Sequence, residues 1–198
     1  MLSAEAIVGL QDRLTEQWHK EPALVADTWD VVLALVARQH RANYDLWHTE
    51  DEARTPNATD AQIVDVKRRI DSTNQLRNDL AEQIDVALLD FLAAKKLPNT
   101  AAPLNSESPG LMIDRLSILA LKIYHTRQEA ERKEAPEGHA TRNQDRLTIL
   151  KEQRRDLSAC LDALWRETLA GTRRFKLYRQ LKMYNDPSLN PAIYGKRK

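Results

Sequence analysis

Apolar residues recur every three or four positions along most of the chain, which is the spacing of an amphipathic helix. The first such run follows Ser3, a good helix-capping residue, and stops before Pro22. Its apolar positions are Ile7, Leu10, Leu14 and Trp18. Further runs predict helices over residues 24–54, 61–96, 111–134 and 141–181. The pattern therefore predicts an all-α fold, an elongated antiparallel bundle of about five helices.

Turn-forming residues separate the predicted helices. The stretch "TPNATD" at 55–60 ends one helix and offers a cap for the next, and the Pro-rich segment 97–110 is predicted to be a long loop. Residues 183–198 carry two Pro, two Tyr and several basic residues, so we predict a non-helical tail. A length of 198 residues suits one core. We therefore expect a single domain, with the bundle in 1–182 and the tail in 183–198.

Polar residues replace apolar ones along one face of the predicted helix 61–96. They step by three or four positions, and they are Lys67, Asp71, Asn74, Asn78, Glu82 and Asp85. Asn and Asp are poor helix formers because their short side chains compete for the backbone. A face open to water would more often carry Glu, Lys, Gln or Arg. This stripe therefore predicts short polar groups that point into the bundle.

The preceding helix, 24–54, changes from apolar to polar along the same face. Its stripe begins with Trp29, Val32 and Val36. It continues as His40, Asn43, Trp47, Glu50 or Asp51, and Arg54. A short turn joins this helix to the next, so the two should pack antiparallel and bring their polar faces together. The predicted polar seam comprises His40, Asn43, Trp47, His48, Glu50, Asp51, Arg54, Asp71, Asn74, Arg77, Asn78, Glu82, Asp85 and, from the next helix, Asp114.

Three interpretations of this seam remain open on the sequence alone. It is a buried hydrogen-bond network that fixes helix register, a pocket for a ligand or a reaction, or a solvated face. If the seam is catalytic, we expect acid–base chemistry by His40 or His48 with a carboxylate. A single divalent ion held by His48, Asp51 and a carboxylate of helix 61–96 is a weaker variant. We assign no metal ligands and no cofactor at this stage.

Several common classes of site lack their motif. There is no phosphate-binding Gly loop and no Gly-x-Ser-x-Gly. A di-iron bundle needs two Glu-x-x-His pairs, and we find one, Glu16 with His19. The one cysteine, Cys160, lies in the stretch "DLSACLDAL", which predicts a small core residue.

Charge is distributed unevenly along the chain, although the net charge is +1. Residues 173–198 carry eight Lys or Arg and one Asp, so a basic tail follows an acidic body. Nucleic-acid binding through this tail is disfavoured, because a tail that packs on the body is a simpler explanation. No apolar run reaches the roughly 18 residues of a membrane span, and the start does not resemble a signal peptide. We expect a cytoplasmic protein, and a homodimer stays open.

Several strings of the sequence together resemble one family of bacterial proteins. They are "LWHTEDEAR", "KRRIDSTNQLRNDLAEQID", "DRLSILALKIYH", "LKEQRRDL" and "KMYNDPSLNP". The family is a domain-of-unknown-function family of all-helical proteins, and the resemblance runs from about His40 to Tyr194. It implies a helical bundle whose genes often lie near those for glycosyltransferases and surface polysaccharides. It implies no catalytic residues.

The resemblance and the polar seam together suggest a function. We expect an accessory or binding module for glycan or surface-polysaccharide assembly, with a glycosyltransferase or a sugar-phosphate as partner or ligand. The alternative is a small acid–base or metal-assisted enzyme that acts on a sugar-phosphate or a nucleotide-sugar.

Overall fold

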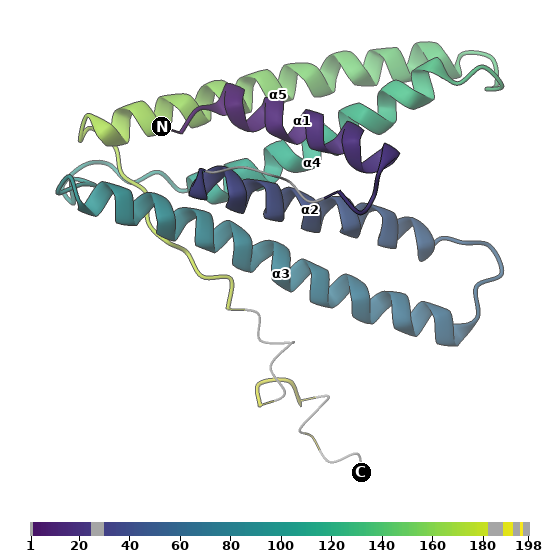
Figure 1. Ribbon diagram of the computed structural model, residues 1–198, viewed down its shortest axis with the longest axis horizontal. Helices are drawn as coiled ribbons and strands as arrows, with labels where there is room; N and C mark the ends of the chain where they lie inside the picture. Colours follow the sequence, from purple (N-terminus) through teal and green to yellow (C-terminus); the bar gives the residue numbers. More distant parts are fainter. Residues whose placement is uncertain (1, 25–29, 182–187, 192–194, 196–198) are drawn as a thin grey trace.

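Five α-helices form the protein in the computed structural model, which describes residues 2–24, 30–181, 188–191 and 195 (Figure 1). The predicted all-α bundle is confirmed, and no strand is present in the described part of the chain. The helices are α1 (Ala4–Lys20), α2 (Val31–Glu52), α3 (Asp60–Ala93), α4 (Pro109–Glu131) and α5 (His139–Leu169).

Polar side chains cap the start of four helices. Ser3, Asp30, Thr59 and Ser108 each accept a hydrogen bond from a backbone N–H in the first turn that follows. Thr59 also forms a reciprocal capping box with Gln62. These bonds satisfy amide groups that the helix itself leaves unpaired. They explain why α1 and α3 begin within a residue or two of the predicted positions.

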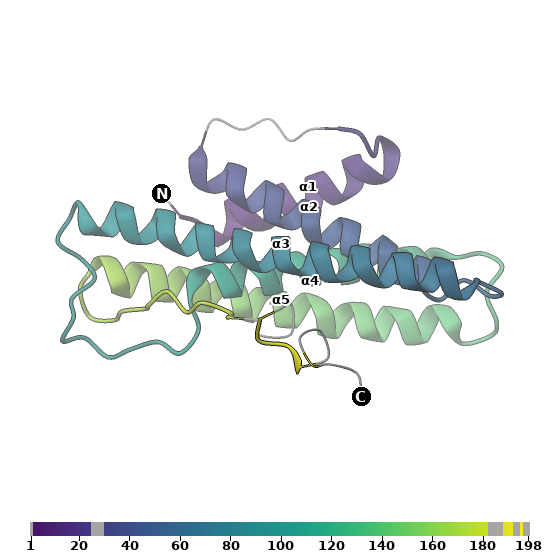
Figure 2. The same cartoon turned by 90° about the horizontal axis from the view of Figure 1, so that it is seen from below.

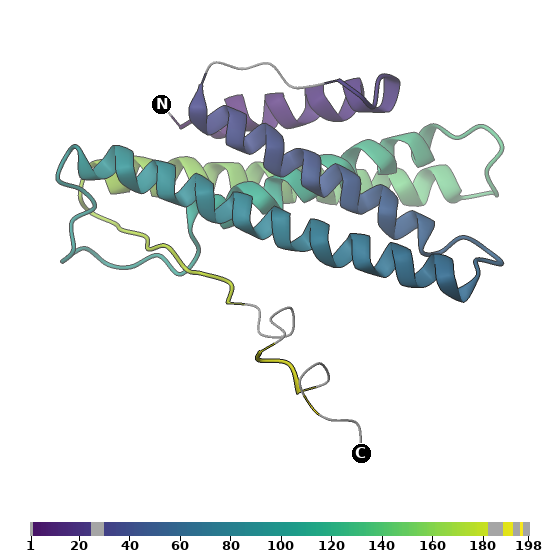
Figure 3. The same ribbon diagram turned by 60° about the horizontal axis from the view of Figure 1, so that its bottom comes forward.

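Two antiparallel helix pairs build the bundle, and α1 lies across them. Helices α2 and α3 run side by side, as do α4 and α5 (Figures 1 and 3). Seen from below, α1 and α2 stand on one side of α3 while α4 and α5 lie on the other (Figure 2). The core contains Ile7, Trp18, Val36, Ile84, Leu88, Ile113, Leu116, Leu161 and Phe175. Arg69 of α3 pairs with Glu52 of α2 at 2.6 Å, which fits the register expected for an antiparallel pair.

The boundaries of two helices differ from the prediction. Helix α5 ends at Leu169 instead of near Leu181, because the chain turns at Gly171, which has a positive φ of 71°. The chain then runs extended beside the loop before α4, where Leu104 and Arg174 form an isolated bridge. Helix α2 begins at Val31 and not near Leu24. Trp29 and most of the non-helical tail 183–198 lie outside the described residues.

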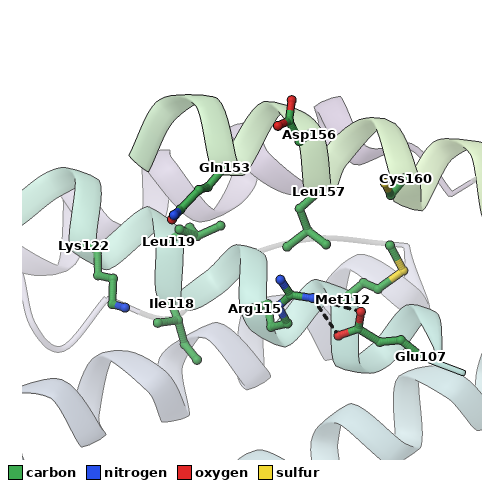
Figure 4. Close-up of a pocket in the computed structure, with 10 residues that line it drawn as sticks. All are labelled: Glu107, Met112, Arg115, Ile118, Leu119, Lys122, Gln153, Asp156, Leu157 and Cys160. Carbon is green, nitrogen blue, oxygen red and sulfur yellow. Dashed lines mark hydrogen bonds and ion pairs between the residues drawn. The ribbon is translucent and has the colours of Figure 1, made fainter. Parts of the chain in front are cut away.

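The prediction that Cys160 belongs to the core is wrong, because its side chain is exposed. The buried stripe of α5 passes through Leu157 and Leu161, and a position next to Leu161 is rotated by about 100° away from that stripe. Cys160 instead lines an open groove between α4 and α5, together with the ion pair of Arg115 and Glu107 at 2.9 Å (Figure 4).

Candidate functional site

Four helices bring a chain of hydrogen-bonded polar side chains together in the middle of the bundle. His40 is fully buried. Its Nε2 lies 2.9 Å from Oγ1 of Thr15, and its Nδ1 lies 2.7 Å from Oγ of Ser117. Ser117 Oγ also accepts a 2.9 Å bond from Nδ2 of Asn43. The polar network, as we call it, consists of Thr15, Gln39, His40, Asn43, Arg77, Asp114 and Ser117.

The proton positions around His40 follow from its burial and from the bonds of Thr15. Burial lowers the pKa of His40 to about 3, so the ring is neutral at pH 7. The Thr15 hydroxyl donates its single proton to the carbonyl oxygen of Gln11 at 2.8 Å, and therefore accepts from Nε2 of His40. His40 Nδ1 then accepts from the Ser117 hydroxyl. The His40 ring is fully buried and bonded at both nitrogens, so it ties helices α1, α2 and α4 together.

The carboxylate of Asp114 closes the network between α3 and α4. Arg77 donates to both oxygens, from Nε to Oδ1 at 2.9 Å and from Nη2 to Oδ2 at 3.0 Å. Asn43 and Gln39 donate to Oδ1 as well. Two-pronged bonding of this kind stabilises a buried carboxylate. The hydrogen-bonding capacity of Asp114 is thus used inside the protein.

A cleft of about 360 Å³ opens at the Arg77 end of the network, a volume within the range of small-molecule sites. Trp47, Leu46, Ile118 and Leu121 give it apolar walls. Its polar lining residues are Asn43, Glu50, Asp51, Arg54 and Arg77. Glu50 and Arg54 form an ion pair at 3.3 Å in which both side chains are well exposed. The cleft therefore combines an aromatic surface with carboxylates, an amide and guanidinium groups.

The structure brings most of the α2 part of the predicted seam together with residues from α3 and α4. His40 and Asp114 belong to the polar network. Asn43 and Arg77 belong to both the network and the cleft, and Trp47, Glu50, Asp51 and Arg54 line the cleft. The hydrogen-bonded network therefore lies beneath a cleft of ligand size.

The other α3 members of the seam lie elsewhere. Asp71 forms an ion pair with Lys67 at the surface, where the Asp71 side chain is 42% exposed. Asn74 accepts a 3.3 Å bond from Arg77, and Asn78 is half-buried. The reason is that α2 alone covers the first half of α3. Before Leu80, Val66 is the one buried residue of this helix.

Glu82 and Asp85, near the end of α3, form hydrogen bonds with residues outside the predicted seam. Glu82 accepts a 2.8 Å bond from the backbone N–H of Gln180, in the segment after α5. Asp85 is buried at the start of α4, where it accepts bonds from the Ser108 hydroxyl and from Gly110 N–H. Burial raises the pKa of Asp85 to about 6. Both carboxylates therefore act as structural anchors for neighbouring segments.

His48, the last residue of the predicted seam, lies in a different group of side chains. Together with His19 of α1 and His125 of α4 it forms what we call the histidine cluster. One ring nitrogen from each residue lies within 4.8 Å of the other two. Trp47 stacks on His125 with ring centroids 4.7 Å apart, and Tyr124 stacks on His19 at 4.2 Å. His48 thus has two histidines beside it, and not the α3 carboxylate that the single-ion variant of the prediction required.

The histidine cluster differs from His40 in its hydrogen bonds. The Nε2 atoms of His19, His48 and His125 are buried and have no hydrogen-bond partner among the described residues. Burial, and then the nearby His19 and His48, lower the pKa of His125 to about 4. Burial and then His19 also lower the pKa of His48. The cluster therefore presents three buried Nε2 atoms that have no partner among the described residues.

Polar stripes on α1 and α4 contain further residues of the network and the cluster, which the predicted seam left out. On α4, Asp114, Ser117 and His125 share a face with Leu121, at steps of three and four residues. On α1, Gln11, Thr15 and His19 step by four. The sequence carries this signal in the spacing. His19 lies one turn after the network residue Thr15, and His125 lies about two turns after the network residue Ser117.

By its fold and its cleft, the protein is a helical bundle in which a buried polar network lies next to a cleft of small-molecule size. More particularly, the chain belongs to the family described as "Protein of unknown function (DUF4254)", whose model matches residues 33–177. The matched region contains the cleft, His48 and His125, and His19 precedes it. No curated protein and no solved structure matched the chain. Among the described helices, none has the length and apolar character to cross a membrane.

Proposed function

We propose that the protein is a cytoplasmic binding module for a sugar-phosphate or nucleotide-sugar, and that it works beside a glycosyltransferase in glycan or surface-polysaccharide assembly. The observation that carries this proposal is the cleft itself, where residues of α2, α3 and α4 meet at a volume suited to a small ligand. The link to glycan assembly comes from the family resemblance.

The lining of the cleft matches a ligand rich in hydroxyl groups. Trp47 offers an apolar ring face or edge against which a sugar or a base packs. The carboxylates of Glu50 and Asp51 accept hydrogen bonds from hydroxyls. Arg77 is held by the mostly buried Asp114, whereas the ion pair of Arg54 with Glu50 is exposed, so Arg54 is the lining residue that would meet a phosphate. Recognition thus depends chiefly on the sugar, with one cation for the phosphate.

The enzyme alternative is an acid–base or metal-assisted reaction on the same ligand class. His40 does not support it, because its ring is buried, neutral and bonded at both nitrogens. The observation in its favour is the histidine cluster, which adjoins the cleft through Trp47. We rank binding first because the residues that line the cleft include no histidine, cysteine or serine.

A thermal-shift screen tests the binding proposal. Nucleotide-sugars, sugar 1-phosphates, free sugars and inorganic phosphate are added in turn to the full chain, and one sugar-containing class should raise the melting temperature. Trp47→Ala should abolish that rise. Phe91→Ala, which removes an exposed aromatic ring from α3 away from the cleft, should keep it. No rise with any compound, or an equal rise in both variants, contradicts the proposal.

A pull-down tests the partner. A tagged chain is co-expressed with a glycosyltransferase of the same organism, and the full chain should retain the enzyme. Deletion of residues 183–198 should release it if the basic tail makes the contact. Equal retention by both forms argues against a role of the tail, and no retention by either argues against the partner.

A further inference from the structure

The histidine cluster gathers unpartnered polar atoms at one place. Within the described part of the chain, six buried side-chain nitrogen or oxygen atoms lack a hydrogen-bond partner, and three of them are the Nε2 atoms of His19, His48 and His125. Each unmade bond of a buried polar group costs about 1–3 kcal/mol. Three such nitrogens from three helices therefore need a common explanation.

The bonds around His19 leave its outer nitrogen free to act as a ligand. Its Nδ1 lies 2.7 Å from the carbonyl oxygen of Thr15, one turn earlier in α1. Because a carbonyl only accepts, Nδ1 carries the proton and Nε2 presents its lone pair. A backbone carbonyl on the far nitrogen is the usual support of a metal-binding histidine.

Aromatic rings hold the three imidazoles in place. Tyr124 stacks on His19, and Trp47 stacks on His125 with the two ring planes only 3° apart. Tyr44 packs its ring against both His19 and His48, at 5.0 and 4.5 Å between centroids. Its hydroxyl is bonded to the backbone of Trp18. Rings that are fixed in this way lose little freedom when they bind a ligand.

We propose that His19, His48 and His125 form a binding site for a divalent transition-metal ion of the zinc type. Imidazole nitrogen is the ligand that Zn²⁺, Ni²⁺ and Cu²⁺ share. Three histidine ligands with a fourth position for water is the arrangement of open zinc sites. The proposal does not require that the neighbouring cleft binds a sugar, so metal binding alone tests it.

The geometry needs a small adjustment to hold an ion. Zn–N bonds of about 2.0–2.1 Å in a tetrahedral site place ligand nitrogens roughly 3.4 Å apart. The three nitrogens here lie within 4.8 Å of one another. A movement of each nitrogen inward by about 1 Å closes the difference.

The ion would be reachable from outside the bundle. His125 and Trp47 also line an open groove of about 390 Å³ together with Lys122, Glu129 and Arg146. The groove reaches the cluster at His125, so the proposal requires this ring to admit the ion from that side.

Calorimetric titration of the metal-free full chain with Zn²⁺ tests the site. One ion per chain should bind, and the variants His48→Asn and His125→Asn should each weaken binding by more than about 100-fold. His139→Asn is the matched control, because His139 lies apart from the cluster and bonds to Glu129. This control should bind as the wild type does.

A second test measures the visible absorption of Co²⁺ bound to the wild-type chain, with Co²⁺ in place of Zn²⁺. Co²⁺ added to the wild-type chain should give the intense visible absorption of a four-coordinate site, and Zn²⁺ should displace it. The weak spectrum of six-coordinate aqueous Co²⁺, absence of a one-to-one zinc isotherm, or equal weakening by His139→Asn would each overturn the proposal.

Discussion

Helix α2 carries two histidines two turns apart whose surroundings are opposite. His40 lies in the polar network and has a protein partner at each ring nitrogen. His48 lies in the histidine cluster, and its Nε2 is buried without a partner in the described structure. The burial of a polar side chain therefore does not separate a structural role from a functional one. The two histidines differ instead in whether both ring nitrogens have a protein partner.

The first prediction breaks the polar network at its most heavily bonded member. Asp114→Ala leaves Arg77, Asn43 and Gln39 without their acceptor, so it should lower the free energy of unfolding by about 3–5 kcal/mol. Urea denaturation measures the loss. A decrease in the free energy of unfolding of less than about 1 kcal/mol would mean that water replaces these bonds easily. It would contradict a structural role of the network.

The second prediction concerns the pH dependence that His40 gives to stability. Its pKa is about 3 in the folded chain and 6.5 when exposed, so the unfolded state binds the proton first as the pH falls. The contribution is fully present above pH 6.5, and about 3 kcal/mol of it should be lost by pH 4. The charged groups nearest to this ring in the network are Asp114 and Arg77, which are paired with each other.

Denaturant titrations at several pH values measure this loss. His40→Gln should flatten the profile between pH 6.5 and 4 relative to the wild type. Parallel profiles of the wild type and His40→Gln would contradict the assignment of a buried, neutral His40.

The third prediction concerns the stability that Zn²⁺ adds when it binds to the histidine cluster, without any change to the polar network. Free Zn²⁺ at about 100 times its dissociation constant should raise the free energy of unfolding by about 2.7 kcal/mol. His48→Asn should remove this gain, and Asp71→Ala should retain it. A similar gain for His48→Asn would place the bound zinc elsewhere on the protein.

The fourth prediction has the smallest effect. Asp71 pairs with Lys67 at an exposed position, so Asp71→Ala should change the free energy of unfolding by no more than about 0.5 kcal/mol. Thermal or urea unfolding checks this value. A loss of several kcal/mol would show that Asp71 belongs to the interior polar groups, as its place in the α3 stripe first suggested.

Periodicity predicted the helices well because each buries one apolar face, as the stripe from Ile7 to Trp18 illustrates. It also predicted the meeting of His40 and Asn43 with Arg77 and Asp114. It placed Asp71 wrongly in the interior, because a stripe on one helix does not show how far the neighbouring helices extend. The histidine cluster escaped prediction since its members lie on three helices, and their proximity depends on how α1 crosses the bundle.

Nitrogen-15 NMR of the histidine rings tests the contrast between the two regions most directly. The chain has five histidines, so each ring is assignable. At pH 7, His40 should show a neutral ring with its proton on Nε2 and should not respond to Zn²⁺. The Nε2 signals of His19, His48 and His125 should shift together at one equivalent of Zn²⁺. A response of His40, or none from the cluster, would contradict the division of these histidines into a satisfied network and an open site.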